Sequence, residues 1–150
     1  MVRIPKDFLE FFKSLNDHDV RYVVVGGYAV AYHGSPRFTG DIDVWVAHDH
    51  TNARGVVAAL EDFGFSGMHI SVDDFTPPDR IVQLGVPPMR IDILTGIDGV
   101  SFADAWKERE QVDIDDVPVF FVSRRLLMQN KAATGRTKDL ADLESLGEDR

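Results

Sequence analysis

The chain has 150 residues, of which 44% are hydrophobic and 27% are charged, so it fits one globular domain spanning residues 1–150. Its net charge of −9 argues against broad, non-specific binding of nucleic acid, which needs many cations to displace counterions. The absence of cysteine excludes disulfides and thiolate metal sites. There is no apolar run of the roughly 20 residues that cross a bilayer, and no secretory signal. We therefore expect a cytoplasmic protein without membrane contact.

The predicted elements alternate between helices and strands. Apolar spacing and turn residues predict, in chain order, a helix after Pro5, a strand at 21–25, a short helix at 28–33, a loop at 35–40, a strand at 41–46, a helix at 51–63, a strand at 68–72, a hairpin of strands 81–84 and 90–94, a helix at 102–108, a strand at 117–122, and helices at 124–133 and 138–146. Helices come before, between and after the strands. This order predicts an α/β (α+β) fold in which helices flank a single mixed β-sheet.

Two aspartates lie in the predicted strand 41–46. Side chains two positions apart on a strand point to the same face, so Asp41 and Asp43 project together while Ile42 and Val44 point into the core. Adjacent carboxylates repel each other unless cations neutralise them, and a hard cation such as magnesium does so with oxygen ligands. A solvated sheet face would show the same pattern.

A third aspartate, Asp92, lies in the strongly apolar segment 90–94, where an unpaired charge is costly. On a strand of the same sheet it would complete a metal site with Asp41 and Asp43. The alternative is an ion pair with Arg90, which lies two residues away and faces the same side of a strand. Strand register is decisive here, because a shift of one residue would turn Asp92 to the other face.

Two further segments suit a phosphate ligand. Gly26 and Gly27 connect a predicted strand to a helix, and such a turn exposes backbone N–H groups and lets a phosphate approach closely. A plain tight turn would have the same sequence. The segment 124–138 carries five basic residues and no acidic one. This cationic patch fits either a triphosphate or a solvated helix face.

The sequence resembles the polymerase-beta-type nucleotidyltransferase superfamily, especially its small bacterial and archaeal members, the minimal and toxin–antitoxin-associated nucleotidyltransferases. The resemblance spans residues 22–146 and implies a nucleotidyltransferase-like fold. Its motifs are, in order, Gly26-Gly27, His33-Gly34, Arg37, Thr39, Asp41-Ile42-Asp43, Ile91-Asp92-Ile93, and a basic segment with Lys131, Arg136 and Lys138 followed by Asp139.

The resemblance also implies roles. The catalytic carboxylates, and the ligands of two Mg²⁺ ions, would be Asp41, Asp43 and Asp92, with Asp92 on the metal that activates the acceptor. The chain would transfer a nucleoside monophosphate from a nucleoside triphosphate (NTP) to an acceptor hydroxyl. The nucleotide would be bound by Gly26, Gly27, Arg37, Thr39, Lys131, Arg136 and Lys138.

Two departures from the family pattern concern the substrates. Better-known members carry a serine after the first glycine, where this chain has Gly27, and larger members append a helical domain where this chain has two short helices after Ser123. The acceptor is therefore a small molecule, a tRNA end or a protein, and the sequence does not choose among them. A partner protein or a second copy of the chain would be a further means of binding the acceptor. The acidic charge disfavours RNA.

Two other interpretations share part of the pattern. A non-catalytic module of the same fold would bind a nucleotide or a toxin–antitoxin partner, but it has no need of three converging carboxylates. A structural protein stabilised by calcium or magnesium would not need Gly26-Gly27 or the basic segment. The three carboxylates, together with Gly26-Gly27 and the basic segment, therefore favour the enzyme.

Overall fold

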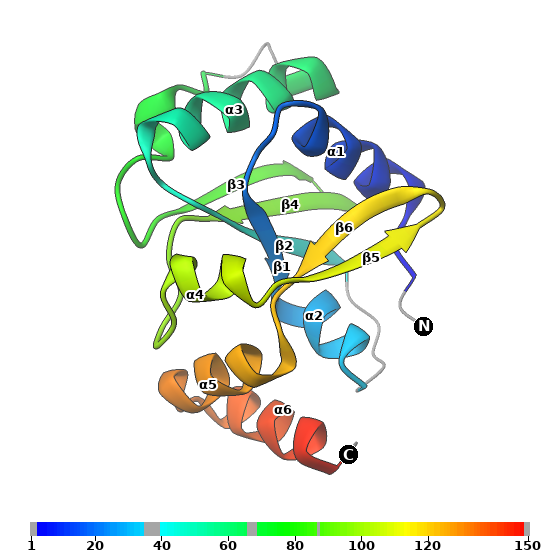
Figure 1. Cartoon of the computed structure of the whole chain (residues 1–150), viewed down its shortest axis with the longest axis vertical. Helices are drawn as coiled ribbons and strands as arrows, with labels where there is room; N and C mark the ends of the chain where they lie inside the picture. The colour runs from blue at the N-terminus through cyan, green and yellow to red at the C-terminus, as the bar shows by residue number, and fades with distance from the viewer. Residues whose placement is uncertain (1–2, 35–39, 66–68, 87, 149–150) are drawn as a thin grey trace.

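A computed structural model describes residues 3–34, 40–65, 69–86 and 88–148 (Figure 1). The elements are, in chain order, α1 (Lys6–Asp17), β1 (Tyr22–Val25), α2 (Gly26–Tyr32), β2 (Asp41–Val46), α3 (His50–Leu60), the turns η1 (Glu61–Phe65) and η2 (Val72–Asp74), β3 (Ile81–Val86), β4 (Met89–Leu94), α4 (Phe102–Lys107), β5 (Glu110–Ile114), β6 (Val117–Phe121), α5 (Arg124–Thr134) and α6 (Thr137–Glu148).

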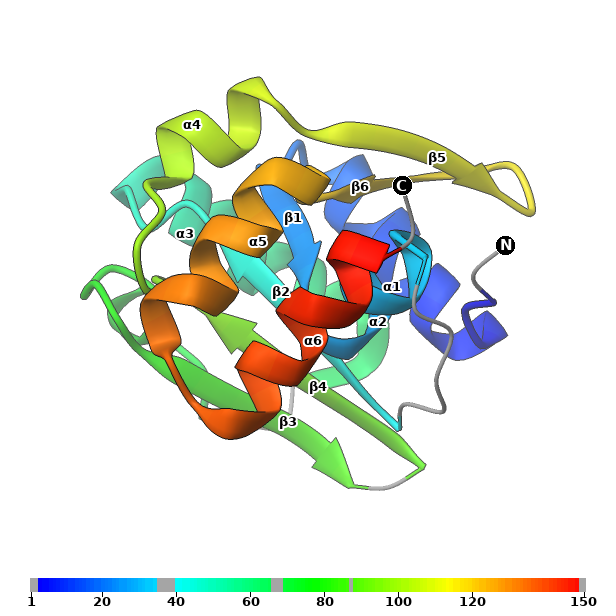
Figure 2. The same cartoon turned by 90° about the horizontal axis from the view of Figure 1, so that it is seen from below.

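The strands form one six-stranded mixed sheet in the order β3-β4-β2-β1-β6-β5. β1 is antiparallel to β2 and parallel to β6, and β4 is parallel to β2 and antiparallel to β3. α1 and α3 cover one face of the sheet, whereas α2, α4, α5 and α6 lie on the other (Figures 1 and 2). The predicted α+β fold with a single mixed sheet is confirmed.

The core follows from the sequence periodicity. The helical spacing of apolar residues on α1 buries one face of that helix, and all four residues of β1 are buried between the two helix layers. Helix ends are marked by local signals. Ser123 accepts a hydrogen bond from the backbone N–H of Leu126 at the start of α5, and Gly135 ends that helix at φ +66°. None of the described helices is long and apolar enough to span a membrane.

The structure differs from the predicted elements in two places. The predicted strand 68–72 is wrong in its described part, because Ser71 and Asp74 form a reciprocal capping box that starts η2; Met68 lies outside the described residues. β5 was not predicted. It lies at the edge of the sheet and, among the described strands, pairs with β6 alone, so its alternate side chains are exposed and polar, and no apolar run marks it.

Candidate functional site

The site begins with the register of the sheet. β2 and β4 run parallel and pair Asp43 with Asp92 and Asp41 with Arg90. Residues paired across adjacent strands point to the same face, so all four side chains lie on the face that α2, α5 and α6 cover. The structure therefore places the three predicted carboxylates on one face of the sheet, with Asp43 and Asp92 directly paired across two neighbouring strands.

Asp43 is the least compensated of these carboxylates. Burial raises the pKa of Asp43 to about 7, and the charge of Asp92, a hydrogen bond with Asp92 and the charge of Asp41 act in the same direction, while Lys131 opposes them. A carboxyl group in this setting repels its neighbours once it ionises. Binding of a cation between Asp43 and Asp92 would relieve that repulsion.

Arg90 already provides part of the compensation. Its Nε lies 3.1 Å from Oδ1 of Asp92 and 3.8 Å from Oδ2 of Asp41. The ion pair considered as an alternative from the sequence therefore exists beside the carboxylate cluster. Within the described part of the chain, no three acidic or histidine side chains converge as a ready metal site. The donor chemistry still fits magnesium, because Asp43 and Asp92 lie side by side with carboxylate oxygens and no cationic side chain of a described residue touches Asp43.

Gly26 shapes the floor of the site next to Asp43. It follows β1 directly and has φ +67°, a conformation that other residues rarely adopt. A Cβ atom at this position would lie 2.0 Å from Oδ2 of Asp43. Only glycine therefore lets the carboxylate of Asp43 pack this closely against the turn.

The opposite wall is formed by α5 and α6, where a second charged cluster is neutralised internally. Lys131, whose side chain is only 10% exposed, places Nζ 3.0 Å from Oδ1 of Asp139 and 3.3 Å from Oδ2 of Asp142. Arg136 donates from Nε to Oδ2 of Asp139 at 2.6 Å, and the hydroxyl of Thr134 donates to the same oxygen at 2.7 Å. Burial alone would raise the pKa of Asp139, but these hydrogen bonds and Lys131 hold it well below its usual range.

The three predicted basic residues therefore differ in availability. Lys131 is committed to two aspartates in the α5–α6 interface. Arg136 uses Nε for Asp139, yet its side chain is 73% exposed, so its terminal amino groups remain accessible. Lys138 is exposed, and no ion pair or hydrogen bond to another described residue involves its side chain. Arg136 and Lys138 are thus the cations available to an incoming anion.

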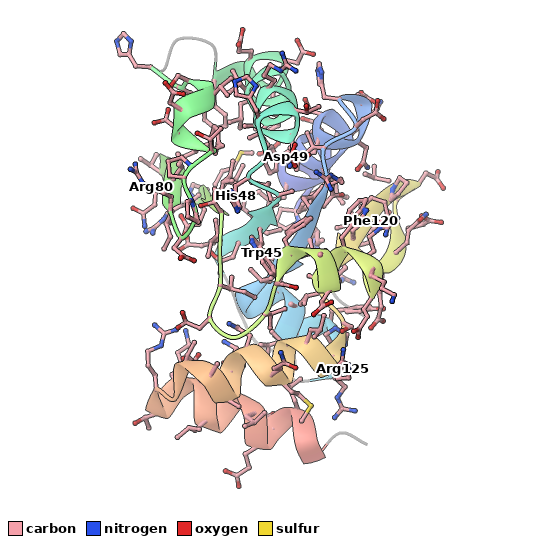
Figure 3. All side chains as sticks on the ribbon, turned by 60° about the vertical axis from the view of Figure 1, so that its left-hand side comes forward. Trp45, His48, Asp49, Arg80, Phe120 and Arg125 are labelled. Atoms are coloured by element: carbon pink, nitrogen blue, oxygen red, sulfur yellow. The ribbon has the colours of Figure 1, made fainter. Side chains whose placement is uncertain are left out.

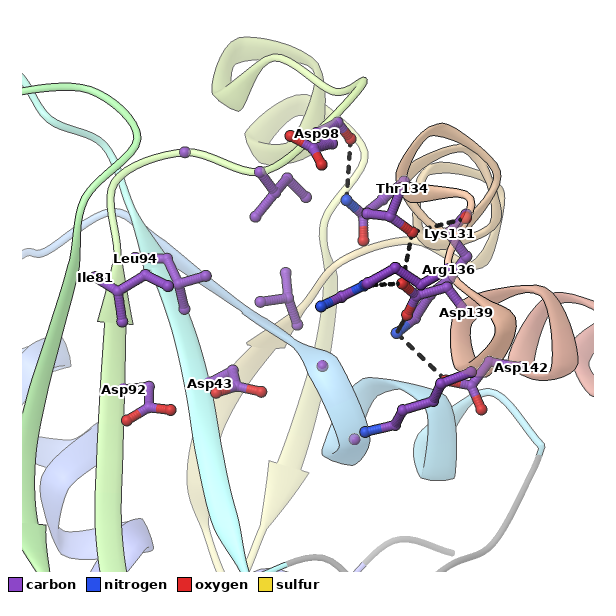
Figure 4. A pocket seen from close by; sticks show the side chains of 17 residues that line it. Asp43, Ile81, Asp92, Leu94, Asp98, Lys131, Thr134, Arg136, Asp139 and Asp142 are labelled. Carbon is purple, nitrogen blue, oxygen red and sulfur yellow. Dashed lines mark hydrogen bonds and ion pairs between the residues drawn. The ribbon is translucent and has the colours of Figure 1, made fainter.

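A cavity of about 480 Å³ separates these two walls (Figure 4). This volume lies within the range of small-molecule sites. The sheet wall carries Asp43, Asp92, Leu94 and Ile81, with Asp98 at the rim, and the α5–α6 wall carries Lys131, Arg136, Asp139 and Asp142. The cavity is also lined by Val25, Gly26, Gly27, Gly96, Ile97, Asn130, Thr134 and Lys138.

Arg37 and Thr39 are outside the described residues. Arg125, labelled in Figure 3 at the start of α5, forms an ion pair with Glu108. Trp45 is buried against Phe102, with ring centroids 5.1 Å apart. Its aromatic ring therefore belongs to the core.

Some residues of the cavity gave no signal in the sequence. Asp98, Asn130 and Thr134 are single polar residues outside any motif, and Ile81 and Leu94 look like ordinary strand residues. Only the packing of α5 against the loop after β4 brings them to one cavity.

Comparisons with known proteins agree with this architecture. The family model described as "Nucleotidyltransferase of unknown function (DUF6036)" matches residues 5–147. A search of curated proteins gave no match. Among solved structures, TM1012 of Thermotoga maritima, assigned to the nucleotidyltransferases, is 18% identical with a TM-score of 0.61, over 99% of this chain and 97% of that one.

Two further solved structures share the fold. The lincosamide antibiotic adenylyltransferase LnuA, with lincomycin bound, is 14% identical with a TM-score of 0.56, and the alignment covers 100% of both chains. The antibiotic-resistance factor ANT(2'')-Ia is 13% identical with a TM-score of 0.58, over 95% of this chain and 83% of that one. At these identities the likeness concerns the fold.

Proposed function

This chain belongs to the nucleotidyltransferase family DUF6036, and from that premise we propose that it transfers a nucleoside monophosphate from an NTP to an acceptor hydroxyl with the help of Mg²⁺. One observation carries the proposal. The sheet register places Asp92, Asp43 and Val25 side by side on three neighbouring strands, and Gly26 follows Val25 directly. A carboxylate pair with the donor type of a magnesium site therefore borders the glycine turn that suits a phosphate.

Asp43 and Asp92, assisted by Asp41, would hold the metal. Bound Mg²⁺ supplies positive charge that lowers the pKa of the attacking hydroxyl and neutralises the leaving pyrophosphate. Arg90, now bound to Asp92 and Asp41, balances part of their charge in the metal-free protein. The carboxylates thus have the donor type and the excess negative charge that such a cation requires.

The residues around the metal position the triphosphate. Gly26 and Gly27 allow its phosphates to approach the backbone, and Arg136 and Lys138 contribute charge from the α5–α6 wall. Lys131 acts indirectly, because its ion pairs with Asp139 and Asp142 join α6 to α5 and so place Arg136 and Lys138 at the cavity. By family resemblance, Arg37 and Thr39 complete the nucleotide contacts.

The transfer itself is an in-line displacement. The acceptor oxygen forms a bond to the α-phosphorus, the bond from that phosphorus to the bridging oxygen breaks, and pyrophosphate leaves with the electron pair. The hydroxyl proton passes to a carboxylate oxygen of Asp92. Positioning and electrostatic stabilisation carry most of the rate enhancement in such reactions.

The structural neighbours support a small-molecule acceptor as one class. LnuA and ANT(2'')-Ia are an antibiotic adenylyltransferase and an antibiotic-resistance factor, and both share this fold. A toxin–antitoxin partner, a homo-oligomer and a cytoplasmic location stay predictions from the sequence.

The proposal is tested by thermal unfolding with each of the four NTPs, with and without Mg²⁺. A ligand at about 100 times its dissociation constant stabilises the folded protein by about 2.7 kcal/mol. We expect Mg²⁺-dependent stabilisation by at least one NTP, lost in Asp43→Asn and retained in Asp17→Asn, a control on α1 at the opposite side of the sheet. Transfer from the stabilising NTP should fall about a thousandfold in Asp43→Asn. Equal stabilisation of both variants would contradict the proposed metal site.

A further inference from the structure

The donor triphosphate as placed above lies on the side of the cavity formed by Gly26, Gly27 and the α5–α6 wall, away from β3. In an in-line displacement the attacking oxygen approaches the phosphorus from the side opposite the leaving group. With the triphosphate in that position, pyrophosphate would leave toward Gly26 and the α5–α6 wall, and the acceptor would come from the other side of Asp92. The next strand on that side is β3, whose Gln83 pairs with Asp92. The acceptor therefore lies over β3, β4 and the loop that follows β4.

This part of the cavity is apolar and acidic. Ile81 of β3 pairs with Leu94 of β4 in the sheet, and both line the cavity with Ile97. The side chain of Ile81 is 60% exposed, although large apolar side chains on this chain are mostly buried. Among the described residues of β3, β4 and the loop to Val100, no basic side chain lines the cavity. Arg90 is turned to Asp92 and Asp41 instead.

Asp98 is presented to this space by a loop that is firmly attached to α5. The side-chain amide of Asn130 donates to the carbonyl of Asp98 at 2.9 Å, and that of Gln129 donates to the carbonyl of Gly99 at 2.7 Å. Gly99 has φ +76° and lies so close to Ala133 that a Cβ would come within 2.5 Å of it. The Asp98 carboxylate itself is exposed at the cavity rim and has no hydrogen bond or ion pair with any other described residue (Figure 4).

We propose that Ile81, Leu94, Ile97 and Asp98 form the acceptor subsite, and that the acceptor is a small molecule with an ammonium group near its reactive hydroxyl and a carbon skeleton whose C–H groups pack on the three apolar side chains. This inference rests on the proposed function, because the side of attack follows from the position of the donor. An ammonium group complements Asp98, and the apolar side chains match a carbon skeleton. A nucleic-acid acceptor would bring phosphates next to Asp92 and Asp98 with no free cation on that wall.

Label transfer tests this acceptor class directly. The protein is incubated with Mg²⁺ and α-labelled NTP, and with glucosamine, glucose, glucuronic acid or total tRNA as acceptor probes. Glucosamine should be labelled fastest and glucuronic acid slowest among the three sugars, since they differ mainly in charge. Labelling of tRNA in preference to every sugar, or no labelling of any sugar at millimolar concentration, would overturn the inference.

Two variants separate the subsite from the donor site. Asp98→Asn should raise the KM for glucosamine about fivefold, as expected for a partly exposed ion pair, and leave that for glucose unchanged. Ile81→Thr keeps a β-branched residue on the strand and should raise the KM for both sugars. Neither variant should alter the thermal stabilisation by Mg²⁺ and NTP, and Asp17→Asn should behave as wild type.

The outcomes distinguish the two proposals. Wild-type protein that no NTP stabilises would remove the proposed function, and the acceptor subsite with it. Stabilisation by NTP combined with an unchanged sugar preference in Asp98→Asn would remove the acceptor subsite alone.

Discussion

Two groups of aspartates face each other across the cavity, and their environments differ. On the sheet wall, burial and neighbouring carboxylates raise the pKa of Asp43 to about 7. On the α5–α6 wall, Asp139 is only 1% exposed, yet hydrogen bonds from Thr134, Arg136 and Lys131 overcome its burial and hold its pKa well below the usual range.

The difference shows how one residue type serves two purposes. Asp139 has its counter-charges supplied by the chain itself, so it stabilises the packing of α6 on α5. Among the described residues no cationic side chain contacts Asp43, so an external cation would have to supply its counter-charge. Repulsion that lowers stability in the metal-free protein is the same interaction that would favour metal binding.

The largest expected effect on stability comes from removing Asp139, the ion-pair partner of Lys131. Asp139→Asn deletes the charge that faces buried Lys131, and breaking a buried ion pair from one side typically costs 3–5 kcal/mol. Because Asp142 remains near Lys131, we expect a loss of about 3 kcal/mol in the free energy of unfolding, measured with urea. Glu108→Gln breaks the more exposed pair with Arg125 and serves as the control. A loss no larger than in the control would show that the α5–α6 network does not stabilise the fold.

A second test uses the pH dependence of unfolding in metal-free protein. The pKa of Asp43 is about 7 when folded and has an ordinary value of 3.8, so the folded state holds the extra proton between these values. The contribution of Asp43 to the free energy of unfolding therefore falls as the pH rises from about 4 to about 7. Asp43→Asn should equal wild type near pH 4 and exceed it at pH 8 by a few kcal/mol at most, since each pKa unit corresponds to about 1.4 kcal/mol.

Asp139 contributes with the opposite sign. Its folded pKa is lowered, so its contribution is present above the ordinary value and is lost as the pH falls below about 4. The two windows do not overlap, and urea unfolding of Asp43→Asn and Asp139→Asn across the pH range separates them. Added Mg²⁺ at pH 8 should remove the advantage of Asp43→Asn; an advantage that persists would place the cation elsewhere.

Two glycines with the same backbone conformation provide a third comparison. Gly26 has φ +67° and Gly135 has φ +66°. Backbone strain from an alanine should therefore lower the free energy of unfolding by a similar amount, roughly 1–2 kcal/mol, at either position. A Cβ at Gly26 would also collide with Asp43, whereas a Cβ at Gly135 meets nothing within 4 Å. Gly26→Ala should therefore unfold more readily than Gly135→Ala by about 1–3 kcal/mol, and it alone should lose NTP binding. Equal melting temperatures would contradict the close approach of Gly26 and Asp43.

The smallest expected effect is a change in NTP binding when the exposed cation Lys138 is removed. Lys138→Ala should raise the KM for NTP about tenfold, or about 1.4 kcal/mol, because it removes one charged phosphate contact, and should leave the melting temperature unchanged. Lys131→Met should lower both stability and activity, since it disrupts the packing of α6. Lys13→Ala on α1 is the control for a lost surface charge. If Lys138→Ala behaves like Lys13→Ala, the triphosphate does not reach this wall.

Much of this protein was determined by the sequence alone. The period of two along β2 places Asp41 and Asp43 on one face, and the helical spacing of Phe8 and Phe12 identifies the buried side of α1. The mixed sheet with helices around it follows from the order of these elements. Such patterns are readable because they depend on residues within a few positions of one another.

Only the tertiary structure decided how the charges are distributed in the site. Asp92 reaches Asp43 because β2 and β4 pair in one particular register, and Arg90 reaches both Asp92 and Asp41 for the same reason. Lys131 looked like a phosphate ligand in the sequence, but the packing of α6 surrounds it with Asp139 and Asp142. The availability of a charge depends on partners and burial contributed by distant segments, and no local pattern in the chain records them.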